Sequence, residues 1–466
     1  MRLLGNKCRL VGEIEKLVSE RGIVGGTFFD IFSGTSSVGA HFKRLGFRVV
    51  ANDHLSACYT KAVAAIEVNR YPDFAGLRDK YRAVFASRTF RESLRVQARL
   101  DLPFRRLGGE EEASPAPADA RSGPPDGKAR SRRRSPDAAS SGRPSVDSGA
   151  WGDPRPLEEA VHLLSTCVAP KEGLISRNYC PGGARKAMYF TDANGRRIDG
   201  MLDFLRENYR ERVLTRWELH LLLSALLDAA DRVANISGTY GSYLKTFQPN
   251  ARASLTLKAP EVIVSGLAHE AHREDANELV RKVSADVLYV DPPYNDRQYA
   301  ANYHILEVIA EHHRVEDLEE YESALYGKTG LRPYEDLKSA YCVAPSSRSE
   351  GRNALSAMTD LILSCRARHV VVSYNEEGLL TREELGAILS RFSGKRSFDY
   401  ETGMRTVLYR RFRSDADRPA AEGRRPKRLY KILEGRRRDE IAEWLLYAVR
   451  PRSSRSPRAA RPGKVS

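Results

Sequence analysis

The order of elements near the start of the chain constrains its fold most strongly. An apolar run at 27–32 predicts a strand, residues 33–39 a glycine-containing loop, 40–45 a helix, and 47–52 a second strand ending at Asp53. Strand, glycine loop, helix, strand and acid in this order are typical of the start of a doubly wound nucleotide-binding sheet. We therefore expect an α/β fold with a mostly parallel sheet.

The rest of the chain divides by composition into six expected segments. Residues 1–75 and 261–412 carry the strands of the α/β core, with later strands at 285–290, 369–374 and 405–410 and helices at 9–20, 56–69 and 381–389. Between them we expect a helical connection at 76–107, a disordered Arg/Pro/Ser-rich insertion at 108–156 and a mainly helical region at 157–260, with its clearest helices at 202–209 and 217–233. The last segment, 413–466, is expected to be a basic tail with one amphipathic helix at 438–449.

Composition restricts the class of protein. No long uncharged apolar run predicts a membrane helix, and the first residues become polar too soon for a signal peptide. The six cysteines are scattered and none forms a C-x-x-C pair, so neither a disulfide framework nor a metal site is indicated. A cytoplasmic protein fits best, and its oligomeric state stays open.

The net charge of +15 favours a polyanionic partner. Much of the arginine excess lies in the two stretches expected to be disordered, however, and basic tails are often only solubilising. Charge alone therefore leaves nucleic acid and simple solubility equally open.

The most informative motif directly follows the strand at 285–290. It consists of Asp291, Pro292, Pro293 and Tyr294. An exocyclic amine of a nucleic-acid base is a poor nucleophile because its lone pair is conjugated with the ring. A fixed carboxylate and a backbone carbonyl held by rigid prolines can accept hydrogen bonds from it, and a neighbouring aromatic ring can stack on an extruded base. The motif is thus typical of amino methylation, although an ordinary Pro-Pro turn would read the same way.

Two further features of the sequence strengthen this interpretation. Small residues between Phe32 and Gly39, with Gly34 among them, let a ligand approach the backbone and the following helix N-terminus. Asp53 is placed to accept hydrogen bonds from ribose hydroxyls, although it could equally cap the helix expected at 56–69.

With these residues in view, the chain resembles the D12 class of adenine-specific DNA methyltransferases, the class of the Dam enzymes. The likeness rests on four blocks in the order of that class. They are the lysine element at 3–7, the glycine motif at 30–39, the acid at 51–53 and the catalytic motif at 289–295. It extends to stretches at 178–190, 238–245, 296–304 and 373–378, and leaves out the Arg/Pro-rich insertion and the tail.

The resemblance implies a Rossmann-like class I methyltransferase core with an inserted helical target-recognition region. It implies S-adenosylmethionine as cofactor and double-stranded DNA, with the target adenine flipped out, as partner. The cofactor site would be formed by Leu3, Lys7, Phe32, Gly34, Gly39, Asp53 and Asp291. The catalytic residues would be Asp291, Pro292, Pro293 and Tyr294, in a site-specific enzyme of modification or restriction-modification.

A DNA-facing patch is suggested by cations near aromatic residues. Its candidates are Arg297, Tyr240, Tyr243, Lys245 and Arg252. Aromatic residues interleaved with cations suit stacking on bases and contacts with phosphates. Packing of the aromatic residues between helices, or a helix end exposed to solvent, explains the same pattern about as well.

The sequence departs from the family pattern in two places. Leu3 stands where an aromatic residue is usual, and Ser36 and Ser37 replace a glycine-containing pair. These departures keep open a DNA-binding relative with weakened catalysis. An amino methyltransferase for N4 of cytosine or for an RNA base is a second alternative, whereas C5-cytosine methylation is disfavoured because no cysteine follows a proline.

Overall fold

A seven-stranded mixed sheet organises the part of the chain that the computed structural model describes, residues 1, 7, 10–105, 151–346, 351–410 and 440–451. The strand order is β3-β2-β1-β4-β5-β7-β6. The strands are β1 (Thr27–Asp30), β2 (Arg48–Asn52), β3 (Glu270–His272), β4 (Ser284–Val290), β5 (Arg366–Asn375), β6 (Met404–Arg410) and β7 (Glu440–Val449). Strands β1 to β5 pair in parallel, and β7 is antiparallel to both of its neighbours. The predicted α/β fold with a mostly parallel sheet is confirmed.

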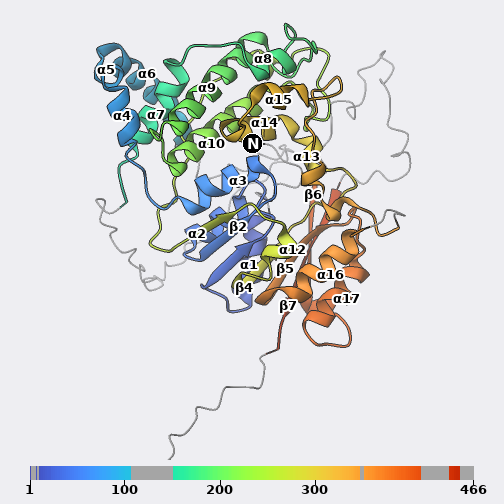
Figure 1. Cartoon of the computed structure of the whole chain (residues 1–466). Coiled ribbons are helices and arrows are strands. Elements are labelled where there is room, and N and C mark those ends of the chain that lie inside the picture. Colours follow the sequence, from blue (N-terminus) through green and yellow to red (C-terminus); the bar gives the residue numbers. More distant parts are fainter. Residues whose placement is uncertain (2–6, 8–9, 106–150, 347–350, 411–439, 452–466) are drawn as a thin grey trace, which may run out of the picture. The chain divides into compact units, whose positions relative to one another are not determined.

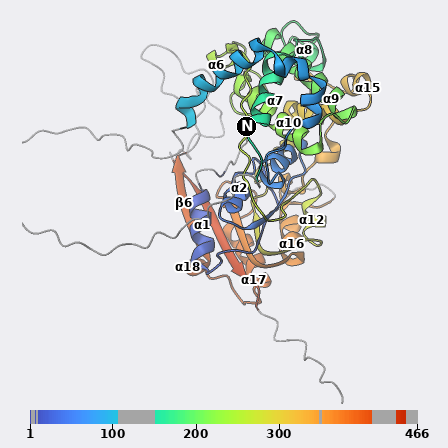
Figure 2. The same ribbon diagram turned by 90° about the vertical axis from the view of Figure 1, so that its left-hand side faces the viewer.

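Helices cover both faces of this sheet (Figures 1 and 2). On one face lie α1 (Val11–Glu20) and α2 (Ser37–Arg44), packed on inward-facing residues such as Phe28 and Val287. On the other lie α12 (Ala276–Leu279), α16 (Ala354–Ser364) and α17 (Arg382–Phe392), packed on Leu288 and Val370. The central strands are therefore buried on both sides, which explains their almost continuous apolar sequences.

A group of helices lies at one end of the sheet (Figure 1). It comprises α7 (Arg155–Thr166), α8 (Leu174–Tyr179), α9 (Asp192–Arg210), α10 (Arg216–Val233), α11 (Pro249–Arg252), α13 (Tyr299–Asn302), α14 (His304–Glu311) and α15 (Leu318–Ser323). It contacts the core through α3 (Ser56–Ala62), which packs against α10 and α14 and continues as a π-helix at Val63–Glu67. Thr191 and Thr215 cap α9 and α10 by accepting hydrogen bonds from Asn194 N and Glu218 N. The predicted helices at 202–209 and 217–233 are confirmed within α9 and α10.

The chain forms two compact units, one of Met1–Lys80 with Asp153–Ser466 and the other of Tyr81–Gly152. The first unit also holds α4 (Ala75–Lys80), α18 (Tyr400–Gly403) and short 3₁₀ turns at His312–Arg314, Glu335–Leu337 and Ala340–Cys342. In the second unit α5 (Arg82–Ala86) is followed by α6 (Arg88–Arg105). Most of the insertion expected at 108–156 lies outside the described residues, as does most of the tail expected at 413–466. The division into six segments stays a prediction.

The prediction of a helix at 438–449 is wrong, because β7 occupies Glu440–Val449 and pairs with β5 and β6 along its length. Ile441, Leu445 and Ala448 recur at a spacing that also suits a helix, and all three are buried. Since an interior strand packs on both faces, its sequence loses the alternation that would have identified it.

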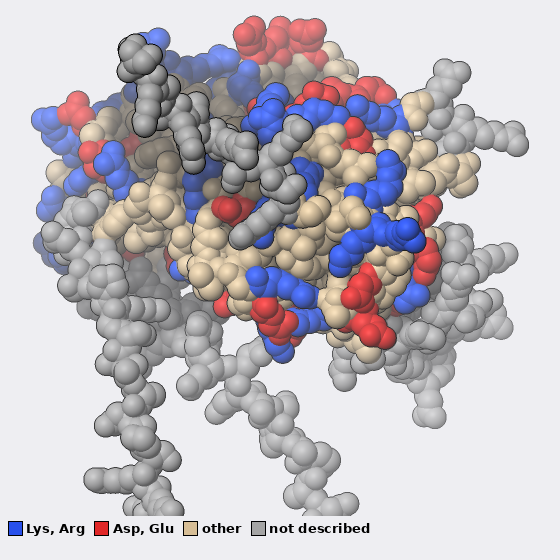
Figure 3. All heavy atoms as spheres, turned by 90° about the horizontal axis from the view of Figure 1, so that it is seen from below, with Lys and Arg blue, Asp and Glu red and all other residues tan. Residues whose placement is uncertain are grey.

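On the face drawn in Figure 3, the described residues do not form a continuous positively charged surface. Lysine and arginine side chains there are interspersed with acidic and uncharged ones. Among the described residues no helix is long and apolar enough to cross a membrane.

Candidate active site

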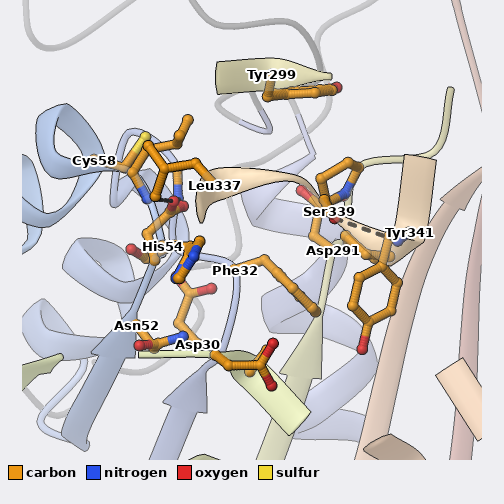
Figure 4. Close-up of a pocket in the computed structure, with 18 of the residues that line it drawn as sticks. Asp30, Phe32, Asn52, His54, Cys58, Asp291, Tyr299, Leu337, Ser339 and Tyr341 are labelled. Atoms are coloured by element: carbon orange, nitrogen blue, oxygen red, sulfur yellow. Dashed lines mark hydrogen bonds between the residues drawn. The ribbon is translucent and has the colours of Figure 1, made fainter. Parts of the chain in front are cut away.

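A pocket lies at the carboxyl ends of β1, β2 and β4, where the sheet order reverses direction along the chain. Open α/β sheets bind ligands at such a position. In Figure 4, Asn52, His54 and Cys58 line one side of the pocket, and Asp291, Ser339 and Tyr341 line the other, with Phe32 between them. Lys7, Gly34, Asp53, Pro292, Pro293 and Tyr294 also line it. The structure therefore brings together the separate motifs singled out in the sequence.

Asp291 follows β4 directly and is ion-paired inside the pocket. Its Oδ1 lies 2.9 Å from Lys7 Nζ, which also lies 2.8 Å from Glu443 Oε1. Burial raises the pKa of Asp291 to about 7; Lys7 opposes this shift and Glu443 adds to it. Burial alone would lower the pKa of Lys7, but the two carboxylates together raise it above its ordinary value. Burial thus makes the Asp291 carboxyl a weaker acid than an exposed aspartate, although Lys7 stabilises its charged form.

The glycine loop bends through a residue that is not glycine. Ser36 has φ +62°, in the left-handed region that favours glycine, and Gly34 has φ +50°. Gly39 N donates to Asp30 Oδ2 at 3.1 Å, and a Cβ at Gly39 would lie only 3.2 Å from that same oxygen. The loop thus adopts a backbone conformation that favours glycine at the position where this sequence has Ser36.

Asp53 joins the end of β2 to the glycine loop. Its carboxylate accepts hydrogen bonds from Gly34 N at 2.9 Å and Leu55 N at 3.0 Å, and burial raises its pKa. It does not cap α3, because Glu307 accepts from the first amides of that helix, Ser56 N and Ala57 N, at 2.8 and 2.9 Å. The helix-cap interpretation of Asp53 is therefore wrong.

Asp30 Oδ1 and Ser33 Oγ are among the buried polar atoms of the pocket that have no hydrogen-bond partner in the described part of the chain. Burial, followed by the negative charge of Asp291, raises the pKa of Asp30 to about 8. Buried polar groups are almost always paired in native proteins. These two atoms therefore fit a ligand that brings polar groups into the pocket.

Aromatic rings surround the catalytic motif. Lys7 Nζ lies 5.6 Å from the ring centroid of Tyr294, whose carbonyl accepts a hydrogen bond from Leu379 N at 2.9 Å. Phe32 meets Tyr341 edge to face at 4.9 Å, and Tyr299 lies above the pocket in Figure 4. These rings offer apolar surfaces to the planar groups of a ligand.

Sequence reasoning missed the segment around 337–341, which also lines the pocket and begins at Leu337, packed against Cys58 of α3. It is attached to the loop after the catalytic motif by Gln298, whose side chain accepts from Ser339 N at 2.8 Å and donates to Ser339 O at 3.1 Å. Cys342 Sγ adds a contact to Arg297 O at 3.3 Å. The segment has no motif, and only the three-dimensional contacts reveal it.

Glu443 was missed as well, because the sequence placed it in a helix of the tail. It is fully buried in β7, facing Lys7. The available signal was a single acid within the otherwise apolar run at 441–449.

The five residues predicted to face DNA are placed differently from one another. The prediction for Tyr240 is wrong: its side chain is 0% exposed and its hydroxyl donates to Asp231 at 3.2 Å. Tyr243 is half-buried with its ring edge on Tyr189, whereas Lys245, Arg252 and Arg297 are exposed. Tyr240 N donates to Asn302 O at 2.7 Å, which fixes this loop beside α13.

Leu3 lies outside the described residues. Among those described, no group of three or more His, Cys, Asp or Glu side chains is arranged to hold a metal ion.

Comparison with known proteins extends the motif evidence. The family model for D12 class N6 adenine-specific DNA methyltransferase matches residues 4–93 and 177–380. The Type II methyltransferase M.FokI of Planomicrobium okeanokoites is 30% identical over 425 residues, which are 91% of this chain and 51% of that protein. M.NlaIII of Neisseria lactamica is 36% identical over 53% of this chain and 67% of its own length. The modification methylase StsI of Streptococcus sanguinis is 28% identical over 89% of this chain and 49% of its own.

The chain thus spans about half the length of the FokI and StsI relatives. No solved structure matches. The family model covers both the glycine loop and the catalytic motif, and it confirms the resemblance found in the sequence. This chain belongs to the D12 class N6 adenine-specific DNA methyltransferase family.

Proposed function

We propose that this chain transfers a methyl group from S-adenosylmethionine to N6 of adenine at a specific site in double-stranded DNA, as a modification enzyme. One observation carries the proposal: Asp291 of the catalytic motif faces the same pocket as the glycine loop and Asp53, and it is ion-paired there with Lys7 at 2.9 Å. Family membership and the names of the modification methylases support it. A cytoplasmic location, where such DNA is found, is part of the proposal.

The residues around the glycine loop suit the adenosyl and amino-acid parts of the cofactor. Asp53 would accept hydrogen bonds from ribose hydroxyls, since its carboxylate lines the pocket. Phe32 would pack on the adenine ring, and Asp30 Oδ1 and Ser33 Oγ would pair with the cofactor's polar groups. Bound there, S-adenosylmethionine supplies an electrophilic methyl group.

The residues of the catalytic motif suit a flipped adenine. In its charged form Asp291 would accept a hydrogen bond from the exocyclic amine and so free the nitrogen lone pair to bond the methyl carbon. The bond from that carbon to sulfur would break, S-adenosylhomocysteine would leave, and the surplus proton on the nitrogen would pass to solvent. Tyr294, packed edge to face on Tyr374 with ring centroids 6.3 Å apart, would stack on the base. Pro292 is buried, Pro293 is half-buried, and together they fix the backbone between these two side chains. Lys7 would hold the Asp291 carboxylate in position.

The exposed cations Lys245, Arg252 and Arg297, with the half-buried Tyr243, are the proposed DNA contacts. The contact of Tyr240 N with Asn302 O keeps the loop that carries Tyr243 and Lys245 next to α13, and hence near the catalytic motif. Phosphate contacts of this kind position a protein on DNA without reading its sequence.

Methylation of duplex DNA by the purified chain, followed by mass spectrometry of the nucleosides, tests the proposal. We expect N6-methyladenine and no other methylated base. Detection of N4-methylcytosine instead would show that the enzyme methylates cytosine and not adenine. Intact DNA binding without any methylated base would favour a relative that has lost catalysis.

A further inference from the structure

The Lys7 ammonium lies between two carboxylates. Its Nζ is 2.9 Å from Asp291 Oδ1 and 2.8 Å from Glu443 Oε1, and the Lys7 side chain is only 4% exposed. Asp291 borders the pocket, whereas Glu443 lies behind Lys7 with 0% exposure and does not line the pocket. Lys7 thus connects a residue of the catalytic motif to a buried residue of another strand.

Glu443 is held rigidly in the sheet. It pairs in register with Asn375 of the neighbouring strand β5. Ser373 Oγ donates to Glu443 Oε1 at 2.6 Å, and Asn375 Nδ2 donates to Oε2 at 3.4 Å. A buried carboxylate is costly unless such partners compensate for lost solvation. Because both of its oxygens are engaged, its position is fixed, and it fixes the ammonium in turn.

The charges of this cluster do not balance. One ammonium meets two carboxylates, and Asp30 faces the same pocket from the end of β1. Asp53 adds a further acid from β2. The two other cations that line the pocket, Lys338 and Arg352, are about half exposed and are paired with Glu335 and Asp360. The buried end of the pocket therefore holds more acidic than basic side chains, and it becomes negatively charged as these acids lose their protons.

We propose that Glu443 is a positioning residue for methyl transfer: it fixes the Lys7 ammonium against Asp291 and makes the pocket anionic, so that the pocket favours a sulfonium cofactor over its neutral thioether product. This inference rests on the proposed function. Glu443 acts by holding Lys7 and through the electrostatic field of its own carboxylate, and it touches neither the cofactor nor the base.

The acids around Lys7 hold protons that a bound cation can displace. Burial, the dominant cause in each case, raises the pKa of Asp291 to about 7 and that of Asp30 to about 8. Besides Lys7 and Glu443, the titratable groups facing Asp291 are Asp30, Tyr289, Tyr294 and Tyr299. A positive sulfonium nearby favours the charged form of each acid and lowers its pKa. At pH 7, binding of S-adenosylmethionine should therefore release protons, and binding of S-adenosylhomocysteine should release fewer.

The first experiment uses the unaltered chain. Calorimetric titration with each ligand at pH 7, in two buffers of different ionisation enthalpy, counts the protons released on binding. More protons released with S-adenosylmethionine than with S-adenosylhomocysteine is the expected result. Equal numbers would overturn the inference. Failure to bind S-adenosylmethionine at all would instead overturn the proposed function.

The second experiment compares Glu443→Gln with Asp199→Asn. Asp199 is a matched control because it is also a buried carboxylate, 2% exposed, that accepts two hydrogen bonds, from Ile175 N and Ser176 N, away from the pocket. For Glu443→Gln we expect the ratio of the Kd for S-adenosylmethionine to that for S-adenosylhomocysteine to rise about tenfold, with a fall in kcat. Asp199→Asn should change thermal stability but not that ratio. A folded Glu443→Gln variant with an unchanged ratio and kcat would refute the role given to Glu443.

Discussion

The two halves of the sheet place residues in the pocket and behind it in different ways. From β3 to β4 the strands are parallel, and the residues that line the pocket follow the strand ends as short sequence motifs. On the other side, β7 is antiparallel and contributes Glu443 from within a strand, through its register with β5. A motif at a strand end is local in sequence and can be recognised there. A residue placed by register depends on a pairing partner far away along the chain.

The largest effect is expected for Asp291→Ala, which tests the half of the sheet whose strands are parallel. We expect loss of turnover by at least about a thousandfold, since the variant lacks the carboxylate proposed to accept from the amine. DNA binding, measured by fluorescence anisotropy, should change little. Asp286→Asn, on the same strand but outside the pocket, is the control and should keep its activity. Near-normal turnover of Asp291→Ala would refute the proposed chemistry.

Lys7→Ala tests the connection between the two halves. The variant leaves Asp291 and Glu443 buried without their common cation, and breaking such a pair costs about 3–5 kcal/mol of unfolding free energy. Cofactor affinity should also fall about tenfold. Urea unfolding and calorimetry measure the two effects, with the exposed Lys16→Ala on α1 as control. If Lys7→Ala matched that control in stability, the two halves would not be coupled through this residue.

The pH dependence of turnover sharpens the comparison further. The charged form of Asp291 is the proposed acceptor, and burial raises its pKa to about 7 in the free protein, so kcat/KM should rise as pH increases from 6 to 8. In Glu443→Gln the loss of a nearby negative charge lowers the pKa of Asp291, and the rise should shift to lower pH. A profile that is identical in both proteins would mean that β7 does not influence the catalytic carboxylate.

The smallest effect is expected at the glycine loop. Ser36 has φ +62°, and this left-handed conformation costs a residue with a side chain about 1 kcal/mol, which Ser36→Gly would remove. The gain is opposed by the larger conformational entropy that glycine gives to the unfolded chain. Unfolding free energy should change by between zero and about 1 kcal/mol in the stabilising direction. Ala40→Gly, inside α2, should destabilise by about 1 kcal/mol. Destabilisation of Ser36→Gly by a similar amount would show that the serine side chain supports the loop.

The sequence predicted those parts of the molecule in which local chemistry decides the structure. The strands β1, β2, β4 and β5 were predicted correctly because their apolar runs and turn residues lie close together. The glycine loop, Asp53 and Asp291 line one pocket, and the roles predicted for them stay predictions. Lys7 was found through the family pattern alone. The sequence motifs give no information about β7, and the spacing of its apolar residues also suits a helix.

The remaining errors have the same origin. Tyr240 looked like a surface aromatic because cations follow it, yet it packs in the interior against Tyr189, with ring centroids 6.1 Å apart. The segment around 337–341 carries no motif and reaches the pocket only through the hydrogen bonds of Gln298. In each case the deciding contact joins residues that are distant in sequence, and no local pattern encodes it.

The pairing of Lys7 with Glu443 has a consequence for the order in which the molecule assembles. The two residues lie near opposite ends of the chain, and the strand that carries Glu443 enters the sheet between β5 and β6. During synthesis the glycine loop and the catalytic motif leave the ribosome well before β7 does. Until that strand is inserted, Lys7 has only one of its two anions, and a nascent chain would hold its catalytic motif in an unfinished electrostatic environment.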